Sequence, residues 1–179
     1  YKGKWLMIDL GIGFAGAYLP GVEVMVPNID AITPYKQDIV GLVITHAHED
    51  HVGAVALLWP ELQCPVYTTP FTAAVLKNKL TEEGLQGRVK IHEVEPGKPY
   101  VLEPFTLEVI PLTHSIPEMH AIAVKTEAGT VMHTGDWKLD ANPLVGPTTD
   151  EDTLKRYGDE GVLAMVCDST NVFVEGESG

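Results

Sequence analysis

The sequence of 179 residues contains little cysteine and no long apolar run. Its two cysteines, Cys64 and Cys167, are too few for a disulfide framework, which favours a reducing, cytoplasmic compartment. We expect both to be small, buried apolar side chains. No apolar run reaches the ~18 residues that a membrane span requires, and no signal peptide opens the sequence. We therefore expect no membrane partner.

Basic residues are also scarce. The sequence has 12 lysines and arginines against 25 aspartates and glutamates, which gives a net charge of −13. This negative net charge argues against a protein that binds nucleic acid through basic side chains alone. It does not exclude one whose positive charge comes from bound metal. With 45% hydrophobic and 21% charged residues, the chain is not disordered and is long enough for a domain with a core. Because the chain starts at Tyr1 without methionine and stops at Gly179 just after a strand-like run, we expect it to be part of a longer polypeptide.

Short apolar runs typical of strands alternate with helical segments, a pattern that indicates sheets covered by helices. The segment 11–34 has no clear period and is expected to be a loop. A helix is predicted from residue 52 to 58, ending before Pro60, and another begins at Pro70, where a first helical turn tolerates proline. Residues 150–161 suggest a polar helix, followed by a buried strand over 162–166. The other predicted strands cover residues 5–8, 40–44, 65–69, 89–94, 107–112, 121–125 and 130–133.

The strongest chemical signal is the run from His46 to His51, directly after an apolar strand. Three histidines and two acids are hard to place in a core, because each buried polar group needs a partner. Imidazoles and carboxylates are ligands that Zn²⁺ or Mn²⁺ prefers. In an extended segment His46 and His48 point the same way, and Asp50 and His51 can turn toward a second ion. The alternatives are a polar loop or a tag, but a tag would be terminal and uniform.

Two further polar groups follow apolar strands, His114 after residues 107–112 and Asp136 after residues 130–133. Alone, His114 would be a strand-end histidine and Asp136 a turn residue. Beside the first cluster, both are predicted metal ligands, since strand ends can converge at one edge of a sheet sandwich. His133 lies three residues before Asp136 and could orient this ligand, and the sequence leaves that role open. His92 and His120 are each predicted to be a surface or packing histidine, and Glu49 is predicted to face solvent.

These motifs resemble the metallo-β-lactamase superfamily. The resemblance rests on the order His46-x-His48-x-Asp50-His51, then His114, then Gly135-Asp136, preceded by Asp9 at the end of the first strand. In that superfamily the first aspartate supports the metal loop and does not bind metal. In finer detail the sequence closely resembles the bacterial ribonuclease J family of β-CASP metallo-nucleases. The segments that carry this likeness are residues 45–54, 114–118, 133–140 and 168–171.

The resemblance implies an α/β fold, the four-layered αββα sandwich of metallo-β-lactamases. Residues 1–179 would form the N-terminal portion of that domain, up to a β-CASP domain inserted after the Asp168 segment. A final metal-binding histidine and phosphate-binding residues would come later in the polypeptide. The implied activity is endonuclease and 5′→3′ exonuclease cleavage of RNA in RNA maturation and decay, by a homo-oligomer (dimer or tetramer). Without the resemblance, Asp168 would be interpreted as capping the end of its strand.

For the metal centre, the model is two divalent ions sharing a hydroxide that attacks phosphorus in line. His46, His48 and His114 would hold one ion, Asp50 and His51 the other, with Asp136 bridging. Zn²⁺ is the first choice, and Mn²⁺ or Mg²⁺ are alternatives. The predicted catalytic carboxylates are Asp50, at the metal, and Asp168, which would protonate the leaving ribose oxygen.

Two other functions remain open at this point. One is a small-ester hydrolase of the same superfamily, a thioesterase or lactonase, which would lack a nucleic-acid domain after residue 179. The other is a non-catalytic RNA-processing scaffold, against which the six intact ligand residues weigh strongly.

Overall fold

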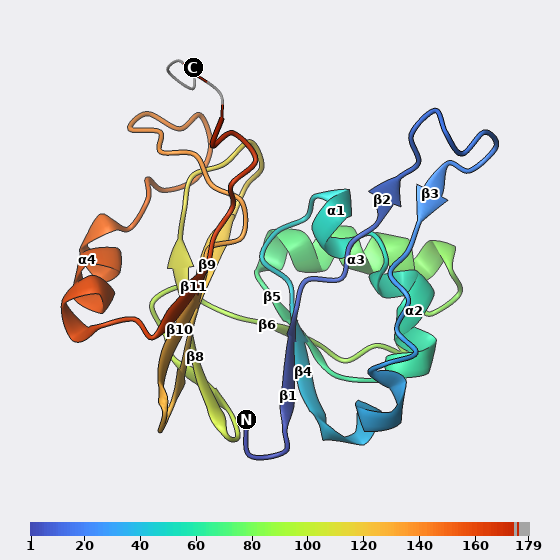
Figure 1. The fold of residues 1–179 in the computed structure, drawn as a ribbon, viewed down its shortest axis with the longest axis horizontal. Coiled ribbons are helices and arrows are strands. Elements are labelled where there is room, and N and C mark those ends of the chain that lie inside the picture. The colour runs from blue at the N-terminus through green and yellow to red at the C-terminus, as the bar shows by residue number, and fades with distance from the viewer. Residues whose placement is uncertain (174, 176–179) are drawn as a thin grey trace. The chain divides into compact units, whose positions relative to one another are not determined.

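The structure is a computed structural model, which describes residues 1–173 and residue 175. The C-terminal end of the predicted domain, residues 176–179, therefore lies outside the described residues. The chain divides into two compact units, Tyr1–Val94 and Glu95–Gly179. Each unit combines one main sheet with at least one helix (Figure 1). We describe the two units separately.

The first unit is built on a parallel sheet of four strands in the order β1-β4-β5-β6. The central strand β4 has buried residues at four of its five positions, as expected for a parallel strand covered on both faces. All four strands were predicted from the sequence, within one or two residues at most ends. Their bounds are β1 (Trp5–Ile8), β4 (Ile39–Val43), β5 (Val66–Thr68) and β6 (Ile91–Glu93).

Three helices, α1 (Glu49–Val52), α2 (Val55–Leu62) and α3 (Pro70–Glu82), complete this unit. Leucines of α2 and α3 pack with Leu42, Ile44 and Val66 of the sheet region in one buried cluster. Pro70 occupies the first turn of α3, as predicted. The prediction that the helix ends before Pro60 is wrong, because α2 continues to Leu62. Its end is closed by Gln63, which adopts a left-handed conformation and donates its N–H to the Trp59 carbonyl at 2.8 Å.

The segment predicted to be a loop contains some regular structure. A short antiparallel ribbon forms between β2 (Gly13–Phe14) and β3 (Val24–Met25), and a 3-10 helix, η1, covers Thr33–Asp38. The ribbon extends away from β1 and β4 (Figure 1). Two-residue strands carry too little periodicity to be recognised in a sequence, which explains why they were missed.

The second unit contains a sheet of five strands in the order β11-β10-β9-β8-β7. β9 and β10, both predicted as strands, form an antiparallel hairpin, and Gly129 at the start of β10 has a positive φ. β7 was not predicted, since its three residues are only partly buried. The strands are β7 (Tyr100–Leu102), β8 (Phe105–Pro111), β9 (His120–Thr126), β10 (Gly129–His133) and β11 (Ala164–Val166).

Helix α4 (Glu151–Glu160) is the predicted polar helix, and its Asp150 cap accepts a hydrogen bond from the Thr153 N–H at 3.0 Å. It is held to the sheet by Glu108, whose carboxylate accepts the Tyr157 hydroxyl and, through both oxygens at 3.0 Å, the Nη2 group of Arg156. Tyr157 is fully buried beneath this polar pair. Burial and the Glu108 charge raise the pKa of Tyr157 to about 12.

Strand β11 and the cysteine that follows it differ from the sequence-based expectation. All three residues of β11 are exposed, because this strand lies at the edge of the sheet and pairs only with β10 among the described strands. Cys167 is exposed as well, so its predicted burial is wrong. Cys64 is buried as predicted, and burial raises the pKa of its thiol to about 11.

Among the described residues, none of the helices combines the length and apolar character needed to cross a membrane.

The buried cluster of the first unit predicts different costs for two leucines on neighbouring helices. Leu76 of α3 is fully buried, whereas Leu57 of α2 is 45% exposed. Leu76→Ala should lower the free energy of unfolding by about 2–5 kcal/mol through lost burial and a residual cavity. Leu57→Ala should change it by no more than about 0.5 kcal/mol. Urea unfolding of both variants checks this, and equal losses would contradict the assigned core.

Candidate metal centre

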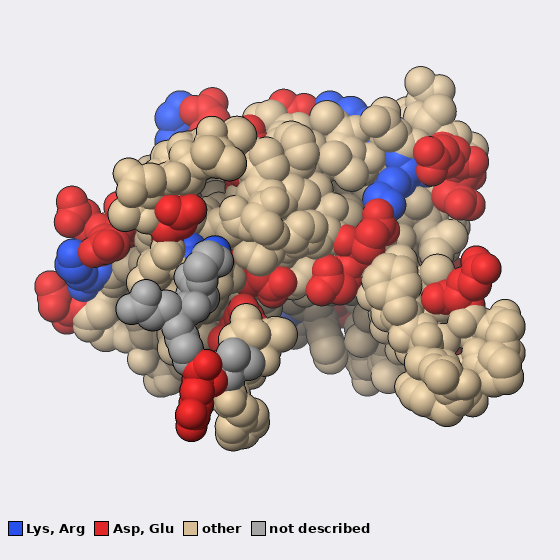
Figure 2. Space-filling model, turned by 90° about the horizontal axis from the view of Figure 1, so that it is seen from above, with Lys and Arg blue, Asp and Glu red and all other residues tan. Residues whose placement is uncertain are grey.

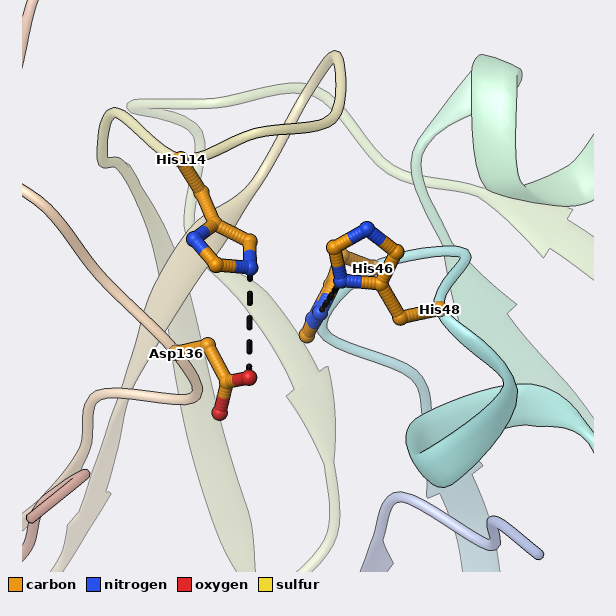
Figure 3. A group of neighbouring side chains, drawn as sticks. All are labelled: His46, His48, His114 and Asp136. Atoms are coloured by element: carbon orange, nitrogen blue, oxygen red, sulfur yellow. Dashed lines mark hydrogen bonds and ion pairs between the residues drawn. The ribbon is translucent and has the colours of Figure 1, made fainter. Parts of the chain in front are cut away.

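The first group of predicted ligands lies in the loop that follows β4. His46 is fully buried, and its Nε2 lies 3.0 Å from His48 Nδ1 (Figure 3). The ring of His46 also lies close to that of His51, with centroids 4.1 Å apart. The hydroxyl of buried Thr45 is 3.0 Å from His46 Nδ1 and so fixes the orientation of this ring. The loop therefore gathers the three imidazoles that the sequence predicted as ligands.

Asp9, at the end of β1, holds both ends of this loop. Its two carboxylate oxygens accept the Thr45 N–H at 2.7 Å and the Thr45 hydroxyl at 2.8 Å, and Oδ2 also lies 2.7 Å from His51 Nδ1. A carboxylate on Nδ1 fixes the tautomer of the imidazole and leaves Nε2 as the ligand atom. In this structure Asp9 thus supports the loop, as the resemblance implied.

Gly11 allows the segment after β1 to lie directly against the helix that carries Asp50. A Cβ at Gly11 would come within 1.8 Å of the Asp50 carbonyl oxygen, so a side chain cannot be accommodated without a backbone shift. Backbone hydrogen bonds join the two segments on either side, from Leu10 N–H to His51 O at 2.7 Å and from Ile12 N–H to Glu49 O at 2.9 Å. The absence of a side chain at Gly11 therefore determines where Asp50 and His51 lie.

Asp50 and Glu49 differ in their surroundings. The Asp50 side chain is 63% exposed, and its Oδ2 lies 3.7 Å from His51 Nε2, so both can offer an atom to one ion. Glu49 does not simply face solvent as predicted, because its Oε1 pairs with Lys79 Nζ of α3 at 2.5 Å. This ion pair connects α1 with α3 and leaves Asp50 as the exposed acid of the motif.

The second group of predicted ligands lies in the second unit, where His114 follows β8 and Asp136 follows β10. His114 Nε2 and Asp136 Oδ2 face each other 3.9 Å apart (Figure 3). Gly135, at a φ of 57°, makes the turn that presents Asp136. The two strand ends of this unit thus converge as the sequence predicted, with a nitrogen and a carboxylate oxygen side by side.

Asp168 follows β11 and lines the same cavity of about 660 Å³ as His114 and Asp136. The Thr170 N–H and hydroxyl donate to Asp168 Oδ1 at 2.8 and 2.7 Å. These bonds, with a smaller contribution from the Trp137 N–H, lower the pKa of Asp168 below its ordinary value. A lowered pKa is typical of an ionised carboxylate, which accepts hydrogen bonds from its surroundings.

The weaker candidates have structural partners. His133 Nδ1 accepts the Gly135 N–H at 3.1 Å, so His133 supports the turn before Asp136. His92 stacks on Tyr67 with ring centroids 4.6 Å apart. His120 is buried, and its Nδ1 lies 3.1 Å from the Glu118 carbonyl oxygen. For His92 and His120 these contacts agree with the packing roles predicted from the sequence.

Sequence reasoning missed the two threonines that precede ligand histidines. Thr45 and Thr113 are both buried, and their hydroxyls tie the loop that carries the next histidine to another segment, Thr45 to Asp9 and Thr113 to Lys138 and Thr149. The repeated Thr-His pair after an apolar strand was a visible signal for this role. Each of these loops is therefore anchored to a segment distant in the sequence through a buried threonine hydroxyl.

Comparison with protein families supports the sequence-based resemblance. Residues 4–163 match the family model described as the beta-lactamase superfamily domain, which includes residues of both units. A metallo-beta-lactamase fold protein of Bacillus subtilis, YhfI, is similar in structure, with a TM-score of 0.56 and 19% identity over 76% of this chain and 52% of its own. The predicted fold class is thereby confirmed.

Curated relatives confirm the finer resemblance. A protein named ribonuclease J from Sinorhizobium meliloti is 45% identical over 98% of this chain and 31% of its own length. Another ribonuclease J, from Helicobacter pylori strain 26695, is 41% identical over 93% of this chain and 24% of its own. The chain therefore spans about a third or less of the length of these relatives.

The close approach at Gly11 generates a prediction for metal affinity. Gly11→Ala should displace the segment carrying Asp50 and His51 and weaken Zn²⁺ binding by roughly 10–100-fold, the range expected when groups that orient ligands are lost. Gly13→Ala is the matched control, since a Cβ there meets only the Met25 methyl at 3.6 Å. Titration against a chelating dye measures both variants. Equal affinities in the two variants would show that the contact at Gly11 does not position the ligands.

Proposed function

Because the chain belongs to the beta-lactamase superfamily, we propose that it supplies metal-binding residues of a ribonuclease J-like nuclease that hydrolyses RNA phosphodiester bonds. The observation that carries this proposal is the set of six ligand-type side chains at strand ends, in a chain 45% identical to a protein named ribonuclease J. The relatives are much longer than this chain, so the activity is proposed for the whole polypeptide.

The donor atoms of both units suit divalent transition metals. Imidazole nitrogens and carboxylate oxygens are the ligands of Zn²⁺ and Mn²⁺, and Asp9 on His51 is the kind of supporting contact that such ligands have. We propose that His46, His48 and His114 hold one ion, that Asp50 and His51 hold a second, and that Asp136 bridges them. Zn²⁺ remains the first choice, with Mn²⁺ or Mg²⁺ as alternatives.

When bound, two such ions supply a nucleophilic hydroxide and neutralise charge on the phosphate. The residues of the chain have separate tasks around this chemistry. Asp9 and Thr45 keep His51 and His46 in fixed orientations. We propose that Asp168, in the cavity with His114, transfers a proton to the leaving ribose oxygen. Because a lowered pKa leaves the Asp168 carboxylate ionised at neutral pH, Asp168 would first take up the proton released by the attacking water and then pass it to the leaving oxygen.

The acidic surface makes the metal centre important for binding RNA. Acidic side chains are more widespread than basic ones on the face shown in Figure 2, consistent with the net charge of −13. Two bound ions carry +4, against −2 from Asp50 and Asp136, so the proposed site is locally positive. In this account phosphate is attracted to the metal centre by the ions rather than by a general basic surface.

The alternatives have less support. A thioesterase or lactonase would use the same ligands, but the curated relatives quoted above are named ribonuclease J. A non-catalytic scaffold has no need for six intact ligand residues and the contacts that orient them. A cytoplasmic location, a homo-oligomer, the β-CASP insertion after the Asp168 segment, and the domain boundaries 1–179 stay predictions.

The metal assignment predicts a difference between two histidines. The full-length polypeptide purified without chelator should hold close to two ions per chain by elemental analysis, on the two-metal model. His48→Ala should reduce that content and abolish RNA cleavage, whereas His92→Ala, in a stacked surface pair, should keep both. A full-length protein that binds neither Zn²⁺ nor Mn²⁺ would refute the proposal.

The role of Asp168 can be tested by changing the leaving group. Asp168→Ala in the full-length protein should lower RNA hydrolysis by roughly 10²–10⁴-fold, the range for a lost general acid. Cleavage of a bis-aryl phosphodiester should fall much less, because an aryl leaving group needs no proton. Asp168→Asn, which retains an acceptor for Thr170, separates proton transfer from loop support. The comparison is made at equal metal content, and equal losses on both substrates would mean that Asp168 is structural.

A further inference from the structure

Two cavities of the second unit share one wall. The larger, of about 660 Å³, contains Asp136, Trp137 and Asp168, and the smaller, of about 350 Å³, contains Ile116 and Leu144. His114, Ser115 and Lys138 line both of them. Each volume falls within the range of small-molecule pockets. A predicted metal ligand therefore lies between two adjacent cavities that could each take a ligand group.

Lys138 is fixed to the His114 loop through its backbone. The Lys138 N–H donates to the Thr113 carbonyl at 2.8 Å, and the buried Thr113 hydroxyl donates to the Lys138 carbonyl. The same hydroxyl lies 3.0 Å from the Thr149 hydroxyl and accepts the Asp140 N–H at 3.1 Å. These bonds fix the backbone position from which the Lys138 side chain lines the two cavities.

The chemistry of the lining differs between the two cavities. Trp137, 40% exposed, offers an aromatic surface in the larger one, beside the hydroxyls and amide of residues 169–171. The smaller one combines apolar side chains, from Ile116, Pro117 and residues 143–145, with the carboxylate of Asp140. Among the residues lining the two cavities, all of them described, Lys138 is the one that always carries a positive charge. A phosphate between two nucleosides matches this arrangement, because its anion would meet the shared wall.

We propose that the two cavities are nucleoside subsites on either side of the cleaved bond, and that Lys138 binds the phosphate between them. Trp137 stacks on the base in the larger subsite, a contact that tolerates any base. The inference rests on the proposed nuclease function, and adds to it one residue that binds the substrate phosphate and one aromatic residue that stacks on a base.

The test separates charge from stacking in the full-length, metal-loaded protein. Values of kcat/KM for a single-stranded oligoribonucleotide are measured at several KCl concentrations. Lys138→Met should lower kcat/KM about tenfold and reduce the slope against log salt by about 0.7, the loss of one phosphate contact on a single strand. Lys138→Arg should restore the slope. Lys98→Met removes the same charge from an exposed surface position and should leave both quantities unchanged.

Variants of Trp137 test the stacking contact separately. Trp137→Leu should lower kcat/KM for the oligoribonucleotide without changing the salt slope, and Trp137→Phe should retain most of the activity. Metal content and thermal unfolding, measured for each variant, identify losses caused by misfolding. If the wild type cleaves RNA but Lys138→Met has the same salt slope as Lys98→Met, the subsite inference is wrong while the nuclease proposal stands. If the wild type cleaves no RNA, the proposed function itself fails.

Discussion

The predicted ligands that follow β4 depend on the hydrogen bonds accepted by the carboxylate of Asp9. It accepts both donors of Thr45 before the histidine motif and contacts His51 at the end of that motif, so one side chain closes the loop. The geometry follows from the parallel pairing of β1 and β4, whose ends lie at the same sheet edge. Without this acceptor, the buried Thr45 N–H and the inward nitrogen of His51 would lose their partner, at a cost of about 1–3 kcal/mol for each buried group.

The two units use the same physical solution. Each has apolar strands that end in a buried threonine followed by a histidine, and each uses a glycine where the backbone must turn or approach closely. In the second unit Thr113 ties the His114 loop to Lys138, and Gly135 presents Asp136. The proposed metal ligands are therefore supported by contacts within their own unit. Such internal support holds ligand atoms in place at little entropic cost when an ion binds.

Much of this could be predicted from the sequence, because the signals were local. Strands such as β4 and β8 are apolar and long enough to recognise, and the predicted ligands begin three residues after each of these strands ends. Burial of β11 was predicted wrongly, because edge position depends on partners distant in the chain. The ion pair of Glu49 likewise depends on a distant partner, Lys79, which lies 30 positions away. Pairing across such distances leaves no periodic signal. The extension of α2 beyond Pro60 has a local cause, the left-handed cap at Gln63.

The central proposal is that, in the full-length polypeptide, residues of both units bind one pair of ions that takes part in phosphodiester hydrolysis. The most direct measurement is anomalous diffraction from crystals of the full-length polypeptide loaded with Mn²⁺. The account predicts two peaks about 3.5–4 Å apart, one contacting His46, His48 and His114 and the other Asp50 and His51, with Asp136 touching both. A single peak, or peaks contacted by residues of only one unit, would contradict it.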